Sequence, residues 1–216
     1  MALFKEHVAL GAVIATVGAV LLYFYAIVTD PLLLAILFLV TVVGSFLPDL
    51  DSDTGTPFYT VFGAFTLACG AATLYYLLKD HPGNLYLLIG APIAVMLFVW
   101  FVVGTIFKHF THHRGMMHSI PTMLIIALVA FLAARYLHQG QFTSLLFALA
   151  AGVGALSHLL LDEIHSDNLV DGNPFVTKKS LGTALKLFSQ SPGINLFTYL
   201  LLAALIYKAI MVYIPG

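Results

Sequence analysis

Charged residues are scarce in this chain: only 9% of its 216 residues are Asp, Glu, Lys or Arg, whereas 61% are hydrophobic. An ordinary soluble domain carries roughly 25% charged residues, so no soluble fold could hide this much apolar surface. The few charges nearly cancel, with a formal net charge of −1, and no basic stripe with interleaved aromatic residues occurs. This pattern excludes a typical nucleic-acid-binding protein. The partners that we expect are membrane lipids or a lipid-linked substrate.

Cysteine is almost absent. The single Cys69 lies inside an apolar run and has no partner for an intramolecular disulfide. One cysteine also excludes a thiolate metal site. Any metal ion would therefore be held by imidazole nitrogen and carboxylate oxygen atoms.

Long apolar runs are abundant, and several are long enough to cross a hydrocarbon core about 30 Å thick, which takes roughly 20 helical residues. A spanning segment must satisfy its own backbone hydrogen bonds, and the alternation of a barrel strand is absent, so the runs are predicted to be helices. The predicted fold is all-α and polytopic, a single integral-membrane domain over residues 1–216 with about seven transmembrane helices. The predicted spans are His7–Val28, Pro31–Leu47, Phe58–Leu78, Leu85–Phe107, Ser119–Leu137, Phe142–Leu161 and Ile194–Ile214.

Lysine and arginine residues between the spans predict the orientation. The side that holds the N-terminus would carry six of them, Lys5, Lys108, Arg114, Lys178, Lys179 and Lys186. The opposite side would carry three, Lys79, Arg135 and Lys208. We therefore expect a multi-pass protein of the inner or plasma membrane with a cytoplasmic N-terminus. The first apolar run is too long for a signal-peptide core and lacks a small-residue cleavage site, so we expect it to stay attached.

The strongest ligand-type side chains all fall on the N-terminal side of this topology. His7 opens the first span, and the second ends in Leu47-Pro48-Asp49-Leu50-Asp51. The fourth and sixth spans return to the same side and lead into the remaining candidates, which are His113, His118, His158 and Asp162. Ionisable groups at a membrane edge are costly and rare. Their convergence from several spans predicts a metal site there.

Alone, none of these residues would indicate a metal. His158 and Asp162 are four apart and share one helical face, but such a pair is more often a hydrogen-bonded structural pair than a ligand pair, and a purely structural cluster is the competing interpretation. Mixed imidazole and carboxylate donors suit zinc, manganese or iron, and zinc is our first choice. There are more donors than one tetrahedral ion needs. Either two ions are bound, or some of the donors only orient a ligand; the sequence is consistent with both. The predicted ligands are His7, Asp49, Asp51, His113, His118, His158 and Asp162.

A divalent ion at this site would lower the pKa of its water toward roughly 7 and so supply hydroxide at physiological pH, which favours hydrolysis. Asp51, where it is not a ligand, could take the proton of that water. Arg114 could hold an anionic oxygen, although it could equally be a topology anchor.

Neighbouring polar residues are weaker candidates. His109 and His112 could exchange with His113 as ligand. For other nearby acidic and histidine residues a solvated loop is the better interpretation: Asp53, Glu163, His165 and Asp167.

The long connection after Asp162 contains a basic amphipathic stretch. Leu181, Leu185 and Phe188 would share one helical face, with lysines available for lipid headgroups. This pattern predicts an interfacial helix. A basic loop flanking the membrane is the alternative.

The polar motifs together resemble the YdjM-like family of membrane-bound proteins, classed as metal-dependent hydrolases, some of whose bacterial members are under LexA control. The matching segments cover most of the chain in order: Glu6-His7, Leu47-Pro48-Asp49-Leu50-Asp51, His113-Arg114-Gly115-Met116-Met117-His118-Ser119 and Ser157-His158-Leu159-Leu160-Leu161-Asp162. That family is similar to the zinc-dependent phospholipase C and single-strand nuclease superfamily, whose all-α enzymes use His and Asp ligands. The soluble enzymes also use a free terminal amine as a ligand, whereas here several residues precede His7.

The resemblance implies phosphoester hydrolysis, with His7, Asp49, His113, His118, His158 and Asp162 as metal ligands. The expected function is hydrolysis of a phosphoester of a lipid or lipid-linked substrate at the cytoplasmic interface. A zinc amide or ester hydrolase of acyl lipids is a second interpretation, since the same activated water serves carbonyl chemistry. A metal transporter or sensor without catalysis is a third. A transporter would place ionisable groups near the bilayer midplane. In this sequence the ionisable candidates lie at the ends of the predicted spans instead.

Overall fold

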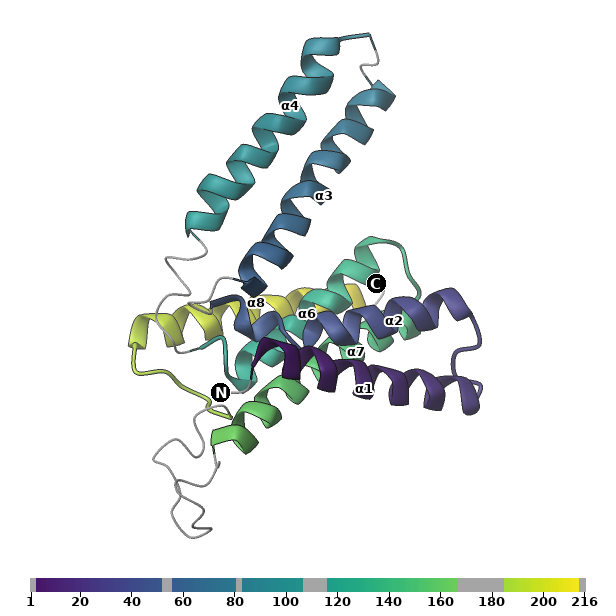
Figure 1. Ribbon diagram of the computed structural model, residues 1–216, viewed down its shortest axis with the longest axis vertical. Coiled ribbons are helices and arrows are strands. Elements are labelled where there is room, and N and C mark those ends of the chain that lie inside the picture. The colour runs from purple at the N-terminus through teal and green to yellow at the C-terminus, as the bar shows by residue number, and fades with distance from the viewer. Residues whose placement is uncertain (1–2, 52–55, 81–82, 107–115, 167–184, 214–216) are drawn as a thin grey trace. The chain divides into compact units, whose positions relative to one another are not determined.

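The computed structural model describes residues 3–51, 56–80, 83–106, 116–166 and 185–213, and the secondary structure of these segments is helical (Figure 1). Seven apolar helices occupy the seven predicted ranges within these segments: α1 (Phe4–Phe24), α2 (Pro31–Gly44), α3 (Thr56–Asp80), α4 (Leu85–Leu97), α6 (Ile120–Tyr136), α7 (Gln141–Ser166) and α8 (Pro192–Tyr213). The short helix η1 (Leu47–Asp51) follows α2, and the π-helix η2 (Phe98–Val103) continues α4. The prediction of an all-α polytopic protein is confirmed.

Five helical segments are long and apolar enough to cross a membrane, judged by length and composition: Phe4–Phe24, Phe58–Lys79, Leu85–Ile106, Gln141–His165 and Pro192–Tyr213. The helices α2 and α6 are equally apolar but shorter. The 14 residues of α2 extend about 21 Å, less than the hydrocarbon thickness of about 30 Å. The second predicted span therefore ends earlier than Leu47, because the chain turns into η1 ahead of Pro48.

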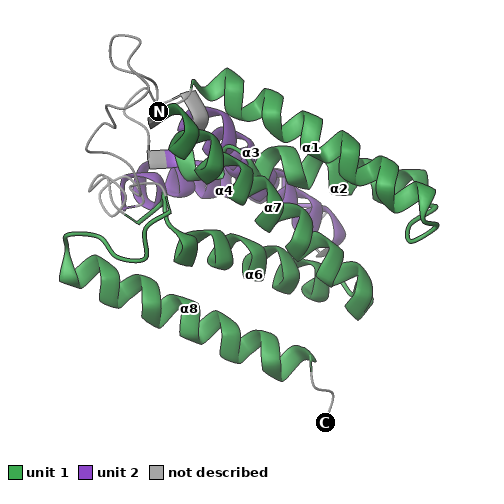
Figure 2. Ribbon diagram, turned by 90° about the horizontal axis from the view of Figure 1, so that it is seen from below, with its two compact units in different colours: residues 1–49, 115–216 green, residues 50–114 purple. Residues whose placement is uncertain are grey.

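The chain divides into two compact units, residues 1–49 with 115–216 and residues 50–114 (Figure 2). In the first unit α7 packs against α1, α2 and α6, and α8 lies beside α6. The second unit is the hairpin of α3 and α4, with an aromatic core in which the rings of Phe58 and Phe62 stack at 4.8 Å and contact Val99. The candidate site lies in the first unit.

Small residues let α1, α2 and α7 approach closely. A Cβ atom added to Gly44 of α2 would lie 2.6 Å from the carbonyl oxygen of Ala151 in α7. A Cβ atom on Gly154 would meet the carbonyl oxygen of Thr41, and one on Gly11 of α1 would meet the side chain of Ser45. Glycine at these contacts permits the backbone proximity typical of membrane helices. The three helices thus form one tightly packed layer.

Two connections also fix how the helices begin. Asp30 is the N-cap of α2, where its carboxylate accepts a hydrogen bond of 3.0 Å from the backbone of Leu32, and Pro31 stands at the first helical position. Ser119 caps α6 in the same way, by accepting a hydrogen bond from the backbone N–H of Thr122. Capping at these two residues sets the direction of both helices as they leave their turns.

Two details correct the sequence predictions. The helix α7 continues to Ser166, five residues beyond the predicted span, so Glu163 and His165 are helical and the loop interpretation of both is wrong. Residues 185–188 are irregular, so the predicted interfacial helix is wrong there. Instead the carbonyl oxygen of Lys186 accepts a hydrogen bond of 3.2 Å from Ile120 at the start of α6. Residues 177–184 of the predicted helix lie outside the described segments.

Candidate metal centre

Five of the predicted metal ligands meet at one end of the first unit. His7 lies in the first turn of α1, Asp49 in η1, and His118 directly before the N-cap of α6. His158 and Asp162 are one helical turn apart on α7. Two groups of these side chains each bring three donor atoms within 4.8 Å of one another, namely His7, His158 and Asp162, and Asp49, His118 and His158. The structure thus brings these five side chains together, and their role as metal ligands stays a prediction.

His158 occupies the centre of the cluster and is held by the backbone of α2. Its Nδ1 atom lies 2.8 Å from the carbonyl oxygen of Ser45 and so must carry the proton that it donates. In neutral imidazole the Nε2 atom then presents a lone pair to the cluster. A carbonyl that fixes the tautomer and ring orientation in this way is the usual partner of a metal-ligating histidine. The side chain is fully buried.

His118 is placed by the turn that precedes α6. The hydroxyl groups of Ser119 and Thr122 each donate a hydrogen bond of 2.5 Å to the carbonyl oxygen of Met116. Ser119, Thr122 and Met116 are buried. The two hydroxyls therefore hold the backbone on both sides of His118 and direct its ring toward α7.

The donor atoms are spaced as ligands of one ion would be. The Nε2 atoms of His158 and His118 are 3.1 Å apart. Each lies 3.5 Å from Oδ1 of Asp49, and they lie 3.5 Å and 3.4 Å from Oδ2 of Asp162. Ligands about 2.1 Å from zinc stand about 3.0 Å apart at a right angle and about 3.4 Å apart at the tetrahedral angle. The observed distances of 3.1–3.5 Å lie within about 0.1 Å of this range.

His7 lacks the hydrogen bonds that a purely structural histidine would make. Its ring stacks on the ring of His158, with centroids 3.7 Å apart and planes inclined by 15°. Both ring nitrogens are buried and make no hydrogen bond with the described residues, although Nε2 lies 3.4 Å from Oδ1 of Asp162. Leaving such groups unsatisfied costs about 1–3 kcal/mol each. A cation near Nε2 would remove part of this cost.

The surroundings of the cluster favour a bound cation. His7, His158 and Asp162 are nearly inaccessible, and the side chains of His118 and Asp49 are only 11% and 14% exposed. Two carboxylates at such a site need a compensating positive charge. The donors are imidazole and carboxylate, which suit zinc, manganese or iron. The residues present can hold a metal ion.

The other predicted site residues are not described at the side-chain level. The side chain of Asp51, and all of His113 and Arg114, lie outside what the structure describes, as do His109, His112, Asp53 and Asp167. Their assignments stay predictions. His165 lies at the rim, 3.6 Å from the carboxylate of Glu6, with both side chains partly exposed. Such a pair contributes little to stability.

The sequence analysis did not identify Ser45 as part of the site. Its contribution comes from a backbone carbonyl, which any residue type provides. The only sequence signal was its place ahead of the Leu47-Pro48-Asp49 motif.

Comparisons with known proteins agree with these observations. The family model described as YdjM inner membrane protein matches residues 1–214 of the chain. Neither the curated proteins nor the solved structures contain a match. The family model covers nearly the whole chain, including all five converging residues, and the fold is that of a multi-pass membrane protein. The chain therefore belongs to the YdjM inner membrane protein family.

Proposed function

We propose that the protein is a membrane-bound metal-dependent hydrolase that cleaves a phosphoester of a lipid or lipid-linked substrate. The observation that carries the proposal is that the Nε2 atoms of His118 and His158 lie 3.1 Å from each other and 3.4–3.5 Å from carboxylate oxygens of Asp49 and Asp162. A divalent ion held there would acidify a water molecule and polarise a phosphoryl oxygen. The donor set contains no thiolate, so zinc is the proposed ion and manganese or iron its rivals.

A second ion is part of the proposal because the two carboxylate oxygens of Asp162 have different neighbours. Its Oδ2 atom faces His118 and His158, whereas Oδ1 lies 3.4 Å from Nε2 of His7. His158 can serve only one ion, because its Nδ1 atom is occupied by Ser45. A second ion could therefore be held by His7 together with the Oδ1 atom of Asp162.

Two side chains of the protein would supply the proton transfer and the anion binding that hydrolysis also needs. Asp51, when not a ligand, would take a proton from the attacking water. Arg114 would hold an anionic oxygen of the phosphoryl group through its planar guanidinium. These two roles are proposed from the sequence, since the structure describes neither side chain.

A lipid substrate is proposed because the cluster lies at the end of a bundle of apolar helices. The ends of helices that span the hydrocarbon core lie near the lipid headgroups, so a lipid headgroup would reach the cluster without leaving the membrane. The lysine and arginine distribution in the sequence supports a cytoplasmic position for this end of the bundle.

Two other functions use the same cluster. A zinc hydrolase of acyl amides or esters would need the same activated water, so product analysis separates it from a phosphoesterase. A metal sensor would use the same cluster without catalysis, whereas a transporter is disfavoured by one observation. The buried ionisable side chains in the described segments are His7, His158 and Asp162, all in the cluster, and a transport path would need others near the midplane.

The test is hydrolysis by detergent-purified protein supplied with zinc or manganese. The substrates are a long-chain phospholipid, a long-chain lipid phosphate and a water-soluble nitrophenyl phosphodiester. Activity that is lost in Asp49→Asn and His118→Ala and kept in His165→Ala would support the proposal. His165 is a suitable control because it lies on α7 but outside the donor cluster. Metal-loaded protein that hydrolyses none of the three substrates would contradict it.

A further inference from the structure

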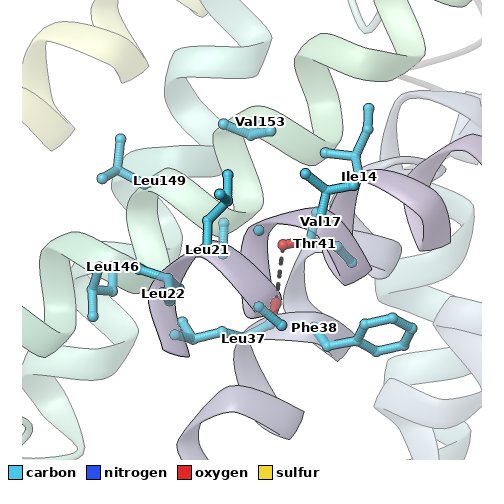
Figure 3. A pocket seen from close by; sticks show the side chains of 14 residues that line it. Ile14, Val17, Leu21, Leu22, Leu37, Phe38, Thr41, Leu146, Leu149 and Val153 are labelled. Atoms are coloured by element: carbon cyan, nitrogen blue, oxygen red, sulfur yellow. Dashed lines mark hydrogen bonds between the residues drawn. The ribbon is translucent and has the colours of Figure 1, made fainter. Parts of the chain in front are cut away.

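An apolar groove runs along α1, α2 and α7 in the first unit (Figure 3). Its volume is about 400 Å³. Its lining includes the small residues Gly18 and Ala150 and larger side chains such as Leu21 and Leu149 (Figure 3). Both leucines are about half exposed, at 49% and 62%, so the groove opens to the outside of the unit.

The residues that line the groove present almost only apolar side-chain atoms to a ligand. Thr41 is the single hydroxyl-bearing residue of the lining, and its hydroxyl donates a hydrogen bond of 2.9 Å to the carbonyl oxygen of Leu37 (Figure 3). No charged residue lines the groove. A polar ligand would lose its hydrogen bonds there without replacement. The groove therefore selects a hydrocarbon.

The groove and the metal centre share two helices, because α1 carries His7 and α7 carries His158 and Asp162. Along α1 the groove extends from Ile14 to Leu22, about 10–22 Å from His7 at 1.5 Å per residue. Along α7 it extends from Val153 back to Leu146, about 8–18 Å from His158. One leaflet of hydrocarbon is about 15 Å deep. The groove thus covers the depth at which the chain of a lipid would lie if its headgroup were at the cluster.

We propose that this groove holds an acyl chain of the lipid whose headgroup lies at the metal centre. The inference rests on the proposed hydrolase function and specifies its substrate as a long-chain lipid. The size of the groove favours a chain over a protein partner. A volume of about 400 Å³ is typical of small-ligand pockets, whereas a helix from a second copy is about 10 Å wide with its side chains.

Gly18 provides a variant that fills the groove. No atom lies within 4 Å of the position that a Cβ atom on Gly18 would take, so a side chain added at this lining residue starts in open space. Val20 is the matched control. It lies on the same helix, is 59% exposed and does not line the groove.

The experiment compares Gly18→Trp, Val20→Trp and unaltered protein, all with their metal content measured first. Binding of dioleoyl phosphatidic acid and of its dibutyryl analogue is followed by native mass spectrometry in detergent. We expect Gly18→Trp to weaken dioleoyl binding by about tenfold, the size of change typical when a hydrophobic pocket is altered. Dibutyryl binding, metal content and both affinities of Val20→Trp should stay unchanged.

Equal dioleoyl binding by Gly18→Trp and Val20→Trp would overturn the inference and identify the groove as ordinary lipid-facing surface. A loss of dimer in Gly18→Trp with unchanged lipid binding would overturn it in favour of a second copy as occupant. The binding measurement does not depend on turnover. If the unaltered protein binds dioleoyl lipid in the groove but hydrolyses nothing, the hydrolase proposal fails while the chain-binding site stands.

Discussion

The side-chain donors of the metal centre can be predicted from the sequence, whereas the backbone atom that orients one of them cannot. His7, Asp49, His118, His158 and Asp162 are all polar residues at ends of apolar runs, and the alternation of spans brings them to one side. Residue type and span order were therefore sufficient to predict their convergence. The carbonyl of Ser45 that orients His158 was not predictable, because a backbone atom leaves no signal in residue type.

The role of His7 is the first prediction at this scale. In His7→Phe the ring that stacks on His158 is kept, but both nitrogens are removed. Loss of a residue that only orients a ligand reduces metal affinity by about 10–100-fold, so loss of a ligand should reduce it at least that much. The variant without metal should be more stable than the parent, because two buried unsatisfied nitrogens are gone.

Metal titration and thermal unfolding of the metal-free protein measure the two effects. His165→Phe, on the rim, is the control and should keep the parent's metal affinity. Unchanged metal affinity in His7→Phe would assign His7 to packing alone.

At the scale of helices, apolar length predicted the elements but not all of their ends. Hydropathy falls at Asp162 and Glu163, yet α7 continues to Ser166, because a helix can carry polar residues once it leaves the apolar layer. In the other direction α2 ends at Gly44, before its apolar run ends. The close contacts made through Gly11, Gly44 and Gly154 depend on which helices become neighbours, which one sequence does not reveal.

Two glycines of α1 give a prediction at the element scale. In Gly11→Ala the new Cβ atom would meet both Oγ and Cβ of Ser45, so a change of rotamer cannot relieve the contact. Overpacking of this kind costs about 1–3 kcal/mol, which exceeds the gain of about 1 kcal/mol for alanine over glycine in a helix. We expect a lower unfolding temperature and weaker metal binding, since Ser45 also holds His158.

Gly18→Ala, two turns along the same helix, meets no atom within 4 Å and should be neutral or stabilising. Thermal unfolding in detergent and metal titration compare the two variants. A Gly11→Ala protein as stable as Gly18→Ala would show that α1 and α2 do not pack as described.

For the whole molecule, composition alone identified the class of protein. With 61% hydrophobic and 9% charged residues, a membrane bundle was the fold that could accommodate the chain, and the match to an inner membrane protein family over residues 1–214 agrees. The division into two compact units was not predicted. It depends on contacts between distant segments, which hydropathy does not record.

Orientation is the prediction that belongs to this scale. The six basic residues on one side against three on the other predict that the N-terminus and the metal centre are cytoplasmic. With the seven spans that the sequence predicts, the end at Gly216 should then be on the outer side. A phosphatase reporter fused after Gly216 should be active, and a fluorescent reporter that matures only in the cytoplasm should be dark. The reverse pattern would place the metal centre outside.

The most direct test of the central claim is the metal content of detergent-purified protein by elemental mass spectrometry. The unaltered protein is compared with the double variant His158→Ala, Asp162→Ala, which removes a nitrogen and an oxygen donor from the centre of the cluster. Near-stoichiometric metal in the unaltered protein and its loss in the variant are the predicted result. No metal in either protein after zinc, manganese and iron supplementation would contradict the account and leave a buried polar cluster that only holds four helical segments together.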